Sequence, residues 1–142
     1  LKAVKENPRM HIPVFGNGDI DSPEKAKIMR DEFGLDGAMI GRASIGNPWI
    51  FNEIKHYLKS GNNLDRPSMK ERVDCCKQHL KHSIDWKGEI LGIAEMKRHY
   101  TNYFKGITDF KPYRIKMVTS NNRELILETL EEVAAEFKNY SF

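Results

Sequence analysis

Residues 12–42 read IPVFGNGDIDSPEKAKIMRDEFGLDGAMIGR, and this stretch decides the fold. It contains two short apolar runs, residues 12–15 and residues 35–40, and a glycine-containing loop follows each of them. Short apolar runs that end in turn residues are typical of buried strands. The two runs are therefore predicted to be strands, and what lies between them decides how they pair.

The intervening residues carry the start and stop signals of a helix. Ser22 is a good N-cap, Pro23 fits the first helical position, and Glu24 suits the positive end of the helix dipole. Gly34 supplies the stop after about three turns. A strand, a helix and a second strand in this order predict parallel strands joined by a right-handed crossover, which is one βαβ unit.

Beyond Pro67 the pattern becomes helical. Ser68 and Glu71 match a capping box at a helix start, and Gly88 separates this helix from a second one. Apolar residues recur at helical spacing through both: Val73, Cys76, Leu80, Ile84, Ile90, Ile93, Met96 and Tyr100. A last helix is predicted over about residues 122–138, so the second half of the chain is expected to form a helical bundle.

Length and composition exclude several classes of protein. A closed (β/α)8 barrel needs about 200 residues, whereas this chain has 142 and begins at Leu1, so we interpret it as a fragment or excised domain. No apolar run reaches the roughly 18 residues of a membrane span, and the first residues lack the apolar region of a signal peptide. We expect a cytoplasmic protein with no membrane contact.

The two cysteines, Cys75 and Cys76, are adjacent. Adjacent cysteines do not form a relaxed disulfide, and they lack the spacing of a zinc or redox motif. We expect a reducing compartment, no metal site, and a place in or beside a packed helix face for both residues.

Charge is unevenly distributed although the net charge is only +3. Residues 97–123 contain seven Lys or Arg against one Asp, a local charge of +6, and residues 124–138 contain five Glu against one Lys, a local charge of −4. A basic segment beside an acidic helix is a pattern of partner binding. Solvated helix faces explain the same charges equally well.

The two loops after the predicted strands have the same chemical character. Residues 16–19 combine two glycines, which permit close backbone approach, with Asn17 and Asp19. Gly41 and Arg42 follow the second strand, and a guanidinium matches the geometry of a phosphate. Either loop alone is explained by a tight turn and a surface cation. Together, on consecutive parallel strands, they favour a phosphate-bearing ligand.

Four segments together resemble the end of the catalytic barrel of bacterial tRNA-dihydrouridine synthases. They are IPVFGNGDI at 12–20, SPE at 22–24, MIGRA at 39–43 and GNPWIF at 46–51. The later sequence is similar to the helical domain of that family more loosely, chiefly through MKRH at 96–99 and YFKG at 103–106. The resemblance implies an α/β fold in which residues 1–60 are the last βα units of an FMN-binding (β/α)8 TIM barrel. Residues 61–142 would then form an all-α, helical tRNA-binding domain.

The resemblance also implies a reaction and a cofactor. Such enzymes are flavoproteins in which NADPH reduces FMN, and the flavin reduces uridine to 5,6-dihydrouridine in tRNA. The residues implied at the phosphate and ribityl end of FMN are Asn17, Gly18, Asp19, Gly41 and Arg42. The cysteine that donates the proton belongs to an earlier barrel loop, which neither Cys75 nor Cys76 matches. We therefore predict no catalytic residue here and no catalysis by this chain alone.

A tRNA surface calls for cations along an extended face. The candidate RNA-binding residues are Lys97, Arg98, Lys105, Lys111, Arg114 and Lys116. Seven residues apart, Arg98 and Lys105 are predicted to share a helix stripe. Interleaved aromatics such as Tyr100 and Phe104 are interpreted as core more than as base-stacking groups, and His99 as structural.

Two other interpretations remain open. One is a different FMN- or phosphate-binding barrel oxidoreductase that acts on a small molecule, because phosphate loops at this place serve many chemistries. The other is a non-enzymatic helical module that binds RNA or a protein. The sequence leaves the uridine position, the tRNA set and the oligomeric state undetermined. Two strands with open edges also predict swapping or pairing between chains.

Overall fold

The structure is a computed structural model that describes residues 2–142. The chain divides into two compact units, Leu1–Asp65 and Arg66–Phe142, called unit 1 and unit 2 below. No helix in the described part of the chain combines the length and apolarity needed to cross a membrane.

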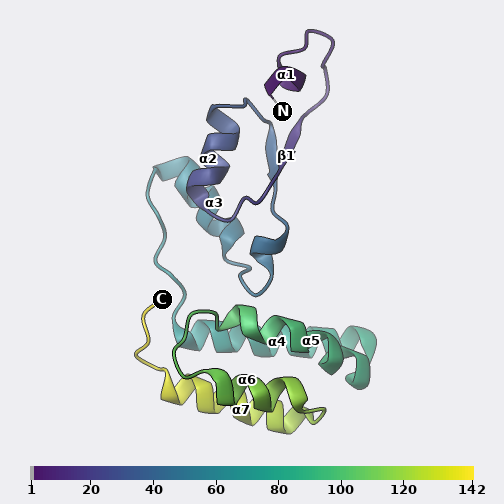
Figure 1. Cartoon of the computed structure of the whole chain (residues 1–142), viewed down its shortest axis with the longest axis vertical. Coiled ribbons are helices and arrows are strands. Elements are labelled where there is room, and N and C mark those ends of the chain that lie inside the picture. The colour runs from purple at the N-terminus through teal and green to yellow at the C-terminus, as the bar shows by residue number, and fades with distance from the viewer. Residues whose placement is uncertain (1) are drawn as a thin grey trace. The chain divides into compact units, whose positions relative to one another are not determined.

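Unit 1 is built on a two-stranded parallel sheet (Figure 1). A short helix, α1 (Lys2–Lys5), precedes strand β1 (Phe15–Asn17), and helix α2 (Pro23–Asp31) connects it to β2 (Gly37–Met39). Phe15 pairs with Gly37 and Asn17 pairs with Met39 in parallel register. The predicted order of strand, helix and parallel strand is therefore confirmed.

The ends of α2 follow the predicted signals. The Ser22 hydroxyl accepts a hydrogen bond from the backbone N–H of Lys25 at 3.3 Å, and Pro23 occupies the first turn. Gly34 lies just beyond the helix with φ of +63°, a left-handed conformation that glycine adopts without a steric penalty. Local capping chemistry thus decides where this crossover helix begins and ends.

After β2 the chain forms a 3₁₀ turn, η1 (Arg42–Ser44), and then helix α3 (Ile50–Ser60). Helix α3 was not predicted from the sequence. The helix ends at Gly61, whose φ is +76°. Its buried residues Ile50 and Ile54 pack with Ile20 and Ala26 in the core of unit 1, so α2 and α3 share one apolar core.

The prediction that residues 12–15 form a buried strand is wrong in both position and burial. The strand begins at Phe15, and the side chains of Ile12 and Phe15 are 70% and 65% exposed. Met39 on β2 is also mostly exposed. The core holds Ile20 and Ala26 instead, because α2 and α3 pack on one another and Phe15 and Met39 lie outside their shared core.

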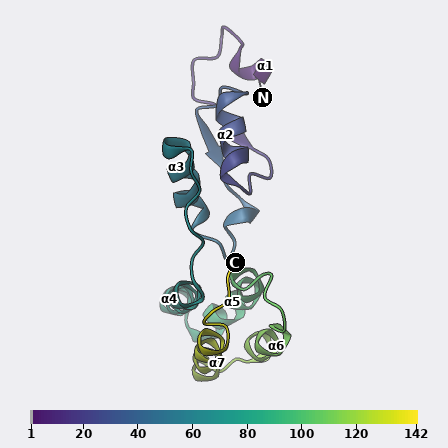
Figure 2. The same cartoon turned by 90° about the vertical axis from the view of Figure 1, so that its left-hand side faces the viewer.

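Unit 2 consists of four packed helices, seen nearly end-on in Figure 2. They are α4 (Met69–Lys87), α5 (Glu89–Tyr103), α6 (Lys111–Thr119) and α7 (Arg123–Glu136). The predicted capping box is present, because Ser68 and Glu71 bond reciprocally at the start of α4. Helix α6 was not predicted from the sequence. Its apolar residues do not gather on one face, because Met117 is buried whereas Ile115 is 45% exposed.

The core of unit 2 is formed by one face of each helix. Residues with no more than 1% exposure include Val73, Cys76, Leu80, Ile93, Met96, Met117, Ile126, Leu130 and Val133. The predicted packing of Cys76 is confirmed, and both cysteines are free thiols. The prediction that Ile90 belongs to the apolar stripe is wrong, because its side chain is 85% exposed in the first turn of α5.

Candidate functional site

The two glycine loops of unit 1 meet at one hollow. Because β1 and β2 are parallel, their carboxyl ends lie at the same edge of the sheet. The hollow has a volume of about 840 Å³. All five residues that the sequence pointed to line it: Asn17, Gly18, Asp19, Gly41 and Arg42. The structure therefore brings this predicted set together.

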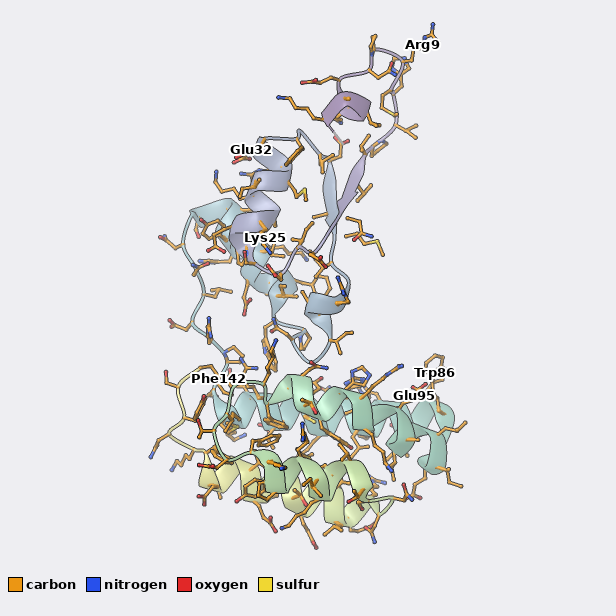
Figure 3. All side chains as sticks on the ribbon, in the orientation of Figure 1. Arg9, Lys25, Glu32, Trp86, Glu95 and Phe142 are labelled. Carbon is orange, nitrogen blue, oxygen red and sulfur yellow. The ribbon has the colours of Figure 1, made fainter. Side chains whose placement is uncertain are left out.

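Two further charged residues line the same hollow and were missed by the sequence reasoning. They are Asp21, just before α2, and Lys25 in the first turn of α2, which is labelled in Figure 3. The Lys25 ammonium lies 2.8 Å from an Asp21 carboxylate oxygen, and it donates to the backbone carbonyl of Asp19 at 3.4 Å. The signal in the sequence was their position around the predicted N-cap Ser22, with Asp21 just before it and Lys25 three residues after it.

Ion pairs hold the charges of the hollow. The Arg42 guanidinium contacts the Asp19 carboxylate, and both side chains are largely exposed. The hydrogen bond from Lys25 lowers the pKa of Asp21 below its ordinary value. Asp19, Asp21, Lys25 and Arg42 therefore contribute two negative and two positive charges.

The backbone of the hollow is open to an approaching ligand. Space is empty within 4 Å of where side chains would begin at Gly18 and Gly41. Asp19 has φ of +43°, which turns the chain sharply after β1. A guanidinium, an ammonium and an uncrowded glycine backbone form a site that fits a phosphate.

The six candidate RNA-binding cations of unit 2 fall into two groups. Lys97 donates to the Asn121 side chain at 2.7 Å, and Lys116 forms a 2.7 Å ion pair with Glu132 that raises the pKa of Lys116. The remaining four lie on α5, on the loop after it and on α6: Arg98, Lys105, Lys111 and Arg114. Of these four, Arg114 is half-buried and the others are exposed.

The predicted helix stripe of Arg98 and Lys105 is wrong. Helix α5 ends at Tyr103, and Lys105 lies in the turn that follows. Gly106 has φ of +95°, a conformation that an α-helix does not contain. Arg98 instead donates from Nε to the Nε2 atom of His99 at 3.2 Å.

The interleaved aromatics belong to the core, as predicted for Tyr100 and Phe104. Both side chains are at most 1% exposed, and Tyr103 is 3% exposed. Tyr113 is half-buried, with its ring centroid 5.6 Å from that of Phe137. These rings stabilise unit 2, and the buried ones are not available to stack on a base.

A cluster of polar side chains lies between α4 and α5. The Nδ1 atom of His79 lies 3.2 Å from the Tyr103 hydroxyl, whose oxygen lies 3.8 Å from the Cys75 sulfur. The His79 and His99 ring centroids are 4.8 Å apart, and burial lowers the pKa of both imidazoles. Among residues 2–142 no three His, Cys, Asp or Glu side chains are arranged to hold a metal ion.

Glutamates of α7 pair with neighbouring helices. Glu131 contacts Lys77 of α4, and Glu132 pairs with Lys116 of α6. Part of the acidic charge of this helix therefore neutralises cations of its own unit.

Comparison with known proteins identifies the family. The Dihydrouridine synthase (Dus) profile matches residues 1–139. A tRNA-dihydrouridine synthase B of Shewanella oneidensis is 46% identical over 99 residues, which are 70% of this chain and 30% of that protein. The proteins of the same name from Pseudomonas putida and Pseudomonas aeruginosa are 40% and 33% identical, over 82% and 98% of this chain. The chain spans 34% and 41% of their lengths. The chain therefore belongs to the dihydrouridine synthase (Dus) family.

Proposed function

We propose that this chain is the C-terminal part of an FMN-dependent tRNA-dihydrouridine synthase, which reduces uridine in tRNA to 5,6-dihydrouridine with NADPH as reductant. In this proposal residues 1–60 are the end of the FMN-binding (β/α)8 barrel and residues 61–142 are the helical tRNA-binding domain. Family membership and the names of the relatives support the reaction.

The hollow between the two loops is the observation that carries the proposal. It gathers Asn17, Gly18, Asp19, Gly41 and Arg42 at the carboxyl edge of two parallel strands, where α/β folds bind phosphorylated ligands. We assign these residues to the phosphate and ribityl end of FMN. When bound, FMN supplies the hydride chemistry. Arg42 would neutralise the phosphate, and the bare backbone at Gly18 and Gly41 would let it approach closely.

Unit 2 would hold tRNA by its phosphates. Arg98, Lys105 and Lys111 have exposed side chains, and Arg114 lies on α6 near Lys111. Lys105, Lys111 and Arg114 are the stronger candidates, because Lys97, Arg98 and Lys116 already bond to side chains of their own unit. A contact with RNA would cost Lys116 its ion pair with Glu132. Phosphate contacts of this kind give affinity that falls steeply with salt.

The chain alone is proposed to be inactive. Hydride transfer needs the reactive ring of the cofactor held against the substrate, and the hollow offers only groups suited to the phosphate end. We assign no catalytic role to Cys75 or Cys76. Cys76 is fully buried and its burial raises the pKa of its thiol, so it is poorly suited to donate a proton to a substrate.

The test uses the full-length protein that contains this chain, purified as it comes from cells. We expect bound FMN in the absorbance spectrum and dihydrouridine formation from unmodified tRNA with NADPH. The variants Arg42→Met and Asn17→Ala should lose both. A colourless protein that still binds tRNA would instead establish a helical RNA-binding module. A flavin-loaded protein that binds no tRNA would favour an oxidoreductase acting on a small molecule.

A further inference from the structure

We infer that Lys25 is a second phosphate-binding cation of the hollow, acting with Arg42, and that Asp21 positions its ammonium while no anion is bound. This inference rests on the proposed function, because the phosphate meant is that of FMN. Lys25 lies outside both glycine loops, so its role follows from the fold and not from a loop motif.

The contacts of Lys25 place its ammonium beside the loop that follows β1. Its ammonium is 2.8 Å from Asp21 and 3.4 Å from the backbone oxygen of Asp19, the residue whose carboxylate contacts Arg42. Lys25, labelled in Figure 3, thus approaches Asp19 from α2, and Arg42 approaches the same residue from η1. A phosphate at this loop would be within reach of both cations.

The charge balance of the hollow favours a second cation. Asp19 and Asp21 both line it, so Arg42 alone would leave a formal charge of −1 facing a phosphate dianion. Lys25 brings the formal charge of the four side chains to zero. A bound phosphate can then replace the two aspartates as the ion-pair partner of Lys25 and Arg42. The exchange is cheap, because ion pairs between exposed side chains contribute little to stability, and both pairs here are more than half exposed.

An ordinary helix-surface pair does not account for this arrangement. The same helix contains such a pair, Lys27 with Asp31, at the same spacing of four residues. Lys27 does not line the hollow, whereas Lys25 does. Lys27 is therefore a matched control for the removal of one lysine from α2.

The experiment measures the affinity of the full-length protein, stripped of flavin, for FMN and for riboflavin, which lacks the phosphate. Wild-type protein should prefer FMN, and that preference alone tests the proposed phosphate site. Lys25→Met should weaken FMN binding about 10- to 100-fold, the loss of one charge-assisted hydrogen bond, and leave riboflavin binding unchanged. Lys25→Arg should retain most of the preference, and Lys27→Met all of it.

Two results would overturn the inference while leaving the proposed function intact. One is a wild-type preference for FMN that Lys25→Met leaves at the level of Lys27→Met. The other is an equal loss of FMN and riboflavin binding in Lys25→Met, which would mean that Lys25 supports the loop and not the phosphate. Wild-type protein that binds both flavins equally, or neither, would overturn the phosphate site itself.

Discussion

The substitution Gly92→Ala sets helix propensity against packing. Gly92 is buried in α5, and a Cβ atom added there would lie 2.7 Å from the Cα and N atoms of Ile84 and 2.8 Å from the carbonyl carbon of Ser83. These are backbone atoms of α4, so no side-chain rotation relieves the overlap. The Ser83 hydroxyl also donates to the Gly92 carbonyl at 3.2 Å. Alanine would therefore force the two helices apart where they meet.

The two effects have opposite signs and different sizes. Alanine in place of glycine favours a helix by about 1 kcal/mol. Overpacking costs about 1–3 kcal/mol, and the contact with rigid backbone places this site at the upper end of that range. Loss of the Ser83 hydrogen bond adds about 1 kcal/mol. We expect a net destabilisation of about 3 kcal/mol, which is about a 150-fold change in the unfolding equilibrium.

Urea unfolding of the 142-residue chain, followed by far-ultraviolet circular dichroism, measures this change. The control is Ala94→Gly, two residues along α5 at an exposed position. It should cost about 1 kcal/mol through helix propensity alone. If Gly92→Ala raises the free energy of unfolding, the close approach of α4 and α5 does not exist as described.

Three further predictions concern acid sensitivity, RNA affinity and helix capping. Because burial lowers the folded-state pKa of His79 and His99, the unfolded chain binds more protons below about pH 6.5. Stability should therefore be complete above that pH and fall below it, with unfolding midpoints at about pH 7.5 and 5.5 as the check; equal midpoints would contradict it. Lys105→Ala should weaken tRNA binding and lower the salt slope by about one, whereas Lys116→Ala should change them less; filter binding across a salt series compares them, and equal effects would reject the grouping. Ser68→Ala should cost about 1 kcal/mol in urea unfolding, and an unchanged midpoint would deny the cap a stabilising role.

In unit 1 the sequence correctly predicted the features that depend on interactions between residues close together in the chain. The start of α2 depends on Ser22 and Pro23, and its end on Gly34, and each acts within one turn of the helix. The apolar character of Ile12 and Phe15 was instead interpreted as burial, and both side chains are exposed. Burial depends on which face of the sheet the helices cover, and hydrophobicity along one strand does not contain that information.

The helices of unit 2 show the same division. Val73, Cys76 and Leu80 repeat at helical spacing, and all three are buried as predicted. Ile90 continues the rhythm and yet lies exposed, because it belongs to the first turn of α5, just after the sharp turn at Gly88. Helix α6 was missed because its apolar residues do not form one stripe, since Met117 is buried whereas Ile115 is exposed.

For the charged residues of the candidate sites, too, the sequence shows what is contiguous in the chain, and the fold shows which charges lie together. The sequence located the two loops of the hollow because their glycines and Arg42 are contiguous signals, but Lys25 became a candidate only when α2 placed it beside the same turn. In unit 2 the sequence counts Lys97 and Lys116 as cations equal to Lys105. The structure separates them, because Asn121 and Glu132 already bond to the first two. The number of cations in a segment therefore does not measure its capacity to bind RNA. A cation that is already paired with a neighbouring side chain is less available to a ligand.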